Sequence, residues 1–110
     1  MKNICSALMI FLCLLILANP VLADYRIDFD GYMKIWNDRI ELASHHLKEA
    51  ESAFKDGDEL QGCVQQRKAA NYGIEATQSL IKAFEISGST DDMSNIKSGL
   101  DKWKELRDFC

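Results

Sequence analysis

Apolar and polar positions follow a helical spacing through most of the chain, beginning with residues 29–55. The apolar residues of this stretch, most of them three or four positions apart, are Phe29, Met33, Trp36, Ile40, Ala43, Leu47, Ala50 and Phe54. Side chains at such spacings share one face of an α-helix. The pattern therefore predicts an amphipathic helix about 40 Å long, with a stripe similar to that of a coiled coil.

The next stretch, residues 58–85, carries two adjacent faces with few charges. The first face is formed by Cys63, Arg67, Ala70, Ile74, Thr77, Ile81 and Phe84, and the second by Ala69, Gly73, Ala76 and Leu80. A helix with two such faces buries them against two neighbours. We therefore expect this helix to be the middle member of a bundle.

A third helix is predicted from residue 93 to the end of the sequence. The residues that repeat at three-four spacing are Met93, Ile96, Leu100, Trp103, Arg107 and Cys110. Between the helices, Gly57 and Gly88 suit left-handed C-terminal caps, and Asp58 suits an N-cap. Ser89 or Thr90 is the expected N-cap of the third helix. Such short connections favour antiparallel neighbours, so the sequence predicts an all-α, antiparallel three-helix bundle of up-down-up topology.

The first 23 residues have the layout of a secretory signal peptide. Lys2 precedes an apolar run from Ile4 to Ala18, and Val21-Leu22-Ala23 provides a small-residue cleavage site. The run is about fifteen residues, shorter than the about twenty that span a bilayer. We expect cleavage after Ala23, one domain at residues 24–110, no stable membrane anchor and export to the periplasm or beyond. An uncleaved anchor is the alternative.

The positions of the cysteines indicate that a disulfide stabilises the bundle. Cys5 and Cys13 lie in the predicted signal peptide, which leaves Cys63 and Cys110 in an export compartment where disulfides persist. If the third helix folds back along the second, Cys110 comes within about one turn of Cys63. We therefore predict a disulfide that closes a loop of about 48 residues and contributes about 4 kcal/mol. Two buried free thiols are the alternative.

Charge narrows the class of partner. The sequence has 13 Lys and Arg against 17 Asp and Glu, a net charge of −4 with neutral histidines. An acidic chain gains little from phosphate contacts, so a nucleic-acid or anionic membrane partner is not expected.

Motifs for catalysis or cofactor binding are missing from the sequence. His45 and His46 are adjacent, so they point about 100° apart on a helix, and there is no third histidine to complete a metal site. We interpret them as a solvated pair. The sequence contains no Cys-x-x-Cys-His haem motif, phosphate loop or nucleophile motif. We therefore expect no enzyme activity and no cofactor.

Two surface features point to protein binding instead. Arg67 and Arg107 interrupt apolar stripes near the predicted disulfide. Their stems can pack while their heads reach Glu59, Asp108 or water, or they can bind an anion or a carboxylate-bearing partner. The apolar residues beside the main stripes are Tyr25, Tyr32, Ile35, Leu42, Val64, Tyr72, Leu80, Leu106 and Phe109. Those left outside the core would form a protein-binding patch or a surface for self-association.

The preferred hypothesis is an exported, non-catalytic interaction module such as an immunity protein, an inhibitor or an adaptor. A small-ligand or haem carrier and a secreted effector are the alternatives. The plan of a short exported helical chain whose last helix carries a disulfide between Cys63 and Cys110 is similar to bacterial periplasmic binding and immunity-type proteins.

Overall fold

The computed structural model describes residues 27–89 and 91–110, which form three helices. They are α2 (Phe29–Lys55), α3 (Glu59–Ser87) and α4 (Met93–Phe109). The predicted signal peptide and Thr90 lie outside the described residues. Among the described helices, none combines the length and the apolar character needed to cross a bilayer.

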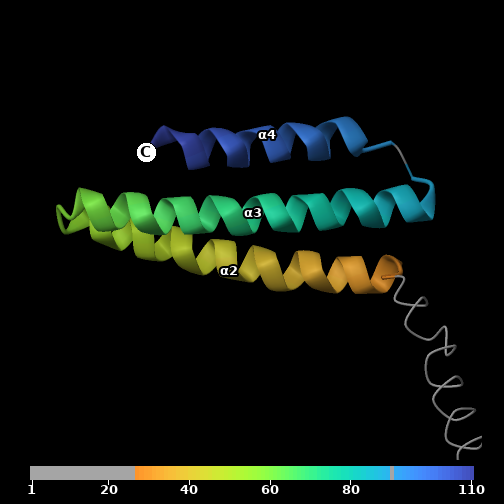
Figure 1. Ribbon diagram of the computed structural model, residues 1–110, viewed down its shortest axis with the longest axis horizontal. Helices are drawn as coiled ribbons and strands as arrows, with labels where there is room; N and C mark the ends of the chain where they lie inside the picture. The colour runs from red at the N-terminus through yellow and green to blue at the C-terminus, as the bar shows by residue number, and fades with distance from the viewer. Residues whose placement is uncertain (1–26, 90) are drawn as a thin grey trace, which may run out of the picture.

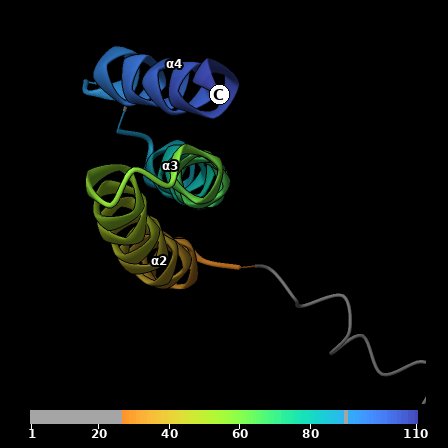
Figure 2. The same cartoon turned by 90° about the vertical axis from the view of Figure 1, so that its left-hand side faces the viewer.

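The three helices run antiparallel, with α3 between the other two (Figure 1). Both α2 and α4 pack along α3, whereas they barely contact each other. The end-on view in Figure 2 shows the order α2, α3, α4, with α3 separating its two neighbours. The predicted all-α up-down-up bundle and the central place of its second helix are therefore confirmed. The arrangement leaves one side between α2 and α4 open.

Small residues bring α2 and α3 close together. The buried alanines of this contact are Ala43 and Ala50 on α2, with Ala69, Ala76 and Ala83 on α3. Side chains this short let two helix backbones approach closely. The ion pair between Arg39 Nε and Glu75 Oε2, 3.0 Å apart, fixes the antiparallel register at the edge of the contact.

The contact between α3 and α4 centres on Gly73. The nearest side-chain atoms above this glycine belong to the indole ring of Trp103, and a Cβ at position 73 would overlap that ring. The space left by the missing side chain is filled from α4 and not from α2.

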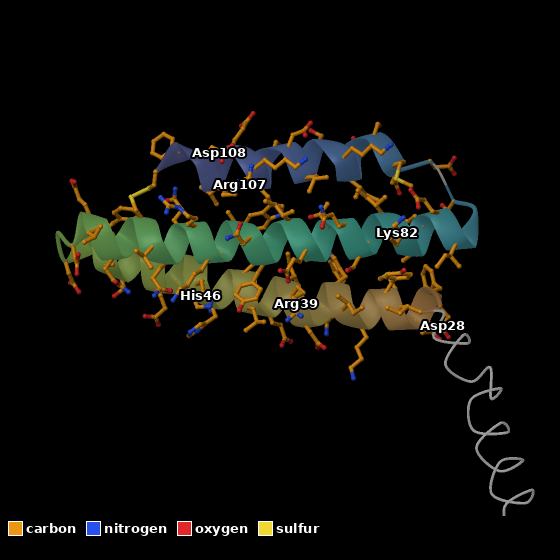
Figure 3. All side chains as sticks on the ribbon, viewed as in Figure 1. Asp28, Arg39, His46, Lys82, Arg107 and Asp108 are labelled. Carbon is orange, nitrogen blue, oxygen red and sulfur yellow. A yellow bond between two sulfur atoms is a disulfide. The ribbon has the colours of Figure 1, made fainter. Side chains whose placement is uncertain are left out.

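A disulfide joins Cys63 of α3 to Cys110 just after α4, with their Cα atoms 5.6 Å apart (Figure 3). Beside it, Gln66 Nε2 donates to the backbone oxygen of Leu106 at 3.2 Å. The predicted pairing of Cys63 with Cys110 is therefore present, at the end of α4 farthest from the α3–α4 connection.

The helix ends follow their capping residues. Gly57 and Gly88 both have positive φ, at 80° and 74°. The backbone N–H of each glycine, and that of the residue after it, donate to carbonyl oxygens of the preceding helix. Asp58 Oδ1 accepts from the backbone N–H of Gln61 at 3.1 Å, as expected for an N-cap. The expected Ser89 or Thr90 cap for the third helix was wrong, because α4 begins one residue after Asp92.

The core is made of small side chains. Among the described residues, no large side chain is fully buried, and the most buried positions are alanines, glycines, Ile74 and Thr77. The bulky apolar side chains of α2 and α4 therefore keep part of their surface in water. That residual surface defines the candidate site.

Candidate functional site

The open side between α2 and α4 is lined by apolar side chains from both helices. Two open hollows of about 440 and 410 Å³ share Leu47. The first is bordered by Phe54 of α2, and the second by Gly99, Trp103 and Leu106 of α4. We call the surface formed by Leu47, Phe54, Gly99, Trp103 and Leu106 the α2–α4 groove.

Helical spacing explains why these side chains share one surface. Leu47 and Phe54 are seven residues apart on α2, and Gly99, Trp103 and Leu106 are four and three apart on α4, so each set lies on one face of its helix. Because α2 and α4 both pack on α3 without closing on each other, each face is only partly covered, with Phe54 lying over Gly62 and Trp103 over Gly73 of α3. Leu47 remains 37% exposed and Phe54 39% exposed.

The groove is bordered by few charged side chains, and only some of them form ion pairs. Glu51 and Lys55, at the Phe54 end, are paired with each other at 3.1 Å. Lys102, on the α4 side, is an exposed cation and makes no ion pair with a described residue. Gln66 of α3 also borders the first hollow, so the groove combines apolar walls with one polar side chain from α3 and the exposed Lys102 at its rim.

No protein family, curated protein or solved structure matches the chain. The function must therefore be argued from the geometry and chemistry of its own residues.

The opposite edge of the α2–α3 contact is polar. His46 Nδ1 lies 2.7 Å from Gln65 Oε1, and the His46 ring stacks on Tyr72 with centroids 5.5 Å apart. The guanidinium carbon of Arg39 also lies 5.9 Å from the centroid of the Tyr72 ring, and Arg39 forms an ion pair with Glu75. Figure 3 labels Arg39 and His46. The predicted solvated histidine pair is therefore correct for exposed His45 but wrong for half-buried His46, which bridges α2 and α3.

Another hollow, of about 620 Å³, lies along this polar edge. Its charged groups already pair with each other, Arg39 with Glu75 and Lys82 with Glu85, the latter at 3.6 Å. A ligand there would have to compete with these pairs. This edge is therefore better explained as the polar border of the helix contact than as a binding site.

The two arginines singled out in the sequence both lie near the disulfide. Arg67 Nη2 donates to the backbone oxygen of Cys110 at 3.1 Å. Arg107 Nε donates to Asp108 Oδ1 at 2.9 Å, and this hydrogen bond raises the pKa of Arg107 and lowers that of Asp108 (Figure 3). Neither arginine is among the residues that border the α2–α4 groove.

Within residues 27–89 and 91–110, no group of three His, Cys, Asp or Glu side chains is placed to hold a metal ion. His46 is engaged by Gln65 and Tyr72, and Cys63 by its disulfide. The chemistry that these side chains offer is packing and hydrogen bonding.

Sequence reasoning noted four of the five groove residues, all except Gly99, but it assigned Leu47, Phe54 and Trp103 to core-facing stripes and did not predict the groove. Leu47 and Phe54 were in the apolar stripe of the first helix, Leu106 was among the surplus apolar residues, and Trp103 was in the third helix. The missing step was that the two outer helices stay apart. The signal for this lay in the central helix, whose two adjacent faces each take one neighbour.

Proposed function

We propose that this chain is an exported, non-catalytic module that binds another protein through the α2–α4 groove, in the manner of an immunity protein, an inhibitor or an adaptor. The observation that carries this proposal is the pair of apolar helix faces left only partly covered on one side of the molecule. Exposed contiguous apolar surface with a polar rim is typical of protein interaction sites.

The proposed occupant is an amphipathic helix of the partner protein. Two helices that both pack along a third leave an elongated depression between them, which has the shape that a further helix fills in a bundle. Helix-in-groove recognition uses apolar anchors at helical spacing, and here Leu47, Trp103 and Leu106 would receive them. Lys102 favours an acidic residue beside the partner's apolar stripe.

The test is affinity capture from the envelope and medium of the producing cells, with the oxidised exported protein as bait and mass spectrometry as readout. Leu47→Glu places a charge in the groove and should reduce capture of the partner at least about tenfold, the effect of losing about 1.4 kcal/mol. Leu60→Glu is the matched control. Leu60 is 79% exposed and borders neither hollow, so its variant should capture as well as the original chain.

Three results would overturn this account. A partner lost on charge reversal at Arg67 or Arg107 but kept by Leu47→Glu would assign binding to the arginine surface. A bait that carries a chromophore, metal or lipid and no protein would favour a ligand carrier. A dimer that Leu47→Glu disperses would assign the groove to a second copy of this chain.

A further inference from the structure

The attachment of α4 is concentrated at its two ends. At one end the chain continues from α3 through residues 88–92, and at the other the disulfide joins Cys110 to Cys63. The two hydrogen bonds from side chains of α3 to the backbone of this segment, Gln66 to Leu106 and Arg67 to Cys110, lie at the disulfide end.

Packing along the length of α4 is shallow. None of its residues, all of which are described, is buried, although the ring of Trp103 lies close over Gly73. Contact with α2 is too slight to hold it in place. In α3, by comparison, eight residues are buried, from Gly62 to Ala83. The position of α4 therefore depends on its covalent links more than that of the other helices.

The groove depends on that position. Trp103, Leu106 and Gly99 belong to α4, so one complete wall of the α2–α4 groove moves if α4 moves. Leu106 is also the residue whose backbone oxygen accepts from Gln66, beside the disulfide. Breaking the disulfide would therefore free the segment of α4 that carries Leu106 and the wall of the groove.

We propose that the Cys63–Cys110 disulfide is a redox latch that holds α4 in place, and that its reduction releases α4 and dismantles the α2–α4 groove. The reductant is a dithiol, such as a protein with a Cys-x-x-Cys site. Its thiolate attacks the sulfur of exposed Cys110, and Cys63 leaves as a thiolate that takes up a proton. The second thiol of the reductant then displaces Cys110, which leaves both cysteines of this chain reduced and the reductant oxidised.

The proposed release of α4 depends only on how α4 is attached, whereas control of binding rests on the proposed function. A reduced chain would lose the wall formed by Trp103 and Leu106 while α2 and α3 remain packed through their buried alanines. The latch therefore predicts a local change and not general unfolding.

Hydrogen exchange of the exported protein, with and without dithiothreitol, tests the latch. Reduction should speed exchange of the amides of residues 93–109 by about three orders of magnitude, the effect expected when a loop of about 48 residues is opened. Amides of α2 and α3 should keep their protection. The Cys63→Ser/Cys110→Ser double variant should reproduce the reduced pattern without reductant.

Unchanged protection in α4, or equal loss in all three helices, would overturn the latch. Capture experiments separate it from the proposed function. If the oxidised chain captures a partner in a Leu47-dependent way and the reduced chain captures it equally well, the groove stands and its redox control fails. If α4 is released on reduction but the oxidised chain captures no protein, the latch stands and the proposed function fails.

Discussion

At the scale of single residues, the side chains that are missing matter as much as those present. Gly73 leaves room for Trp103, and Gly62 leaves room for the ring of Phe54, whose atoms would lie 2.6 Å from a Cβ at position 62. A side chain added at Gly62 would have a different effect from one added at Gly73. Phe54 is 39% exposed and can swing outward, whereas Trp103 is the main apolar contact of α4 with α3.

We predict that Gly73→Ala destabilises the protein by about 1–3 kcal/mol, because the new methyl group displaces the Trp103 ring. Gly99→Ala is the matched control, since nothing lies within 4 Å of a Cβ there and alanine favours a helix by up to about 1 kcal/mol. Thermal unfolding followed by circular dichroism compares the two. Equal stability of both variants would show that Trp103 does not depend on Gly73.

At the scale of the helices, the caps set where each one starts and stops. Asp58 makes a side-chain hydrogen bond to the first turn of α3, whereas Asp92, at the start of α4, makes no such bond to a described residue. The two aspartates therefore occupy equivalent positions with different interactions.

Asp58→Ala should cost about 1 kcal/mol of stability because the N–H of Gln61 loses its acceptor. Asp92→Ala should lower the stability by only a few tenths of a kcal/mol, because it removes only the weaker interaction of a carboxylate with the helix dipole. Urea unfolding of the two variants measures the difference. A larger loss for Asp92 than for Asp58 would contradict the capping geometry.

The sequence was sufficient to predict the three helices but not all of the contacts between them. Three-four spacing, Gly57 and Gly88 located the helices, and the antiparallel register brought Cys110 to Cys63. Periodicity identifies the apolar face of a helix but not the rotation of its neighbour about it. For that reason neither the contact of Trp103 with Gly73 nor the polar bridge from His46 to Gln65 was foreseen.

At the scale of the whole molecule, the bundle has a central helix with two covered faces and two outer helices that do not close on each other. Alanines and glycines form most of the buried positions, so the burial of large apolar side chains stays incomplete. A domain of this size gains much of its stability from a cross-link. The disulfide and a bound partner would both compensate for the small core.

Processing of the chain is a prediction at the same scale. If the signal peptide is removed after Ala23, the exported protein begins at Asp24, lacks Cys5 and Cys13, and contains one disulfide and no free thiol. Intact mass measurement before and after reduction and alkylation checks both points. A mass that retains residues 1–23 would instead indicate an uncleaved anchor.

The central claim is that the open side between α2 and α4 binds a partner protein, and site-specific photo-crosslinking in the producing cells tests it most directly. A photoreactive amino acid at position 47 should give one major adduct with another protein, whereas the same group at position 60 should give none. The adduct at position 47 should disappear when both cysteines are replaced by serine. Adducts only at position 60, or none at position 47, would contradict the account.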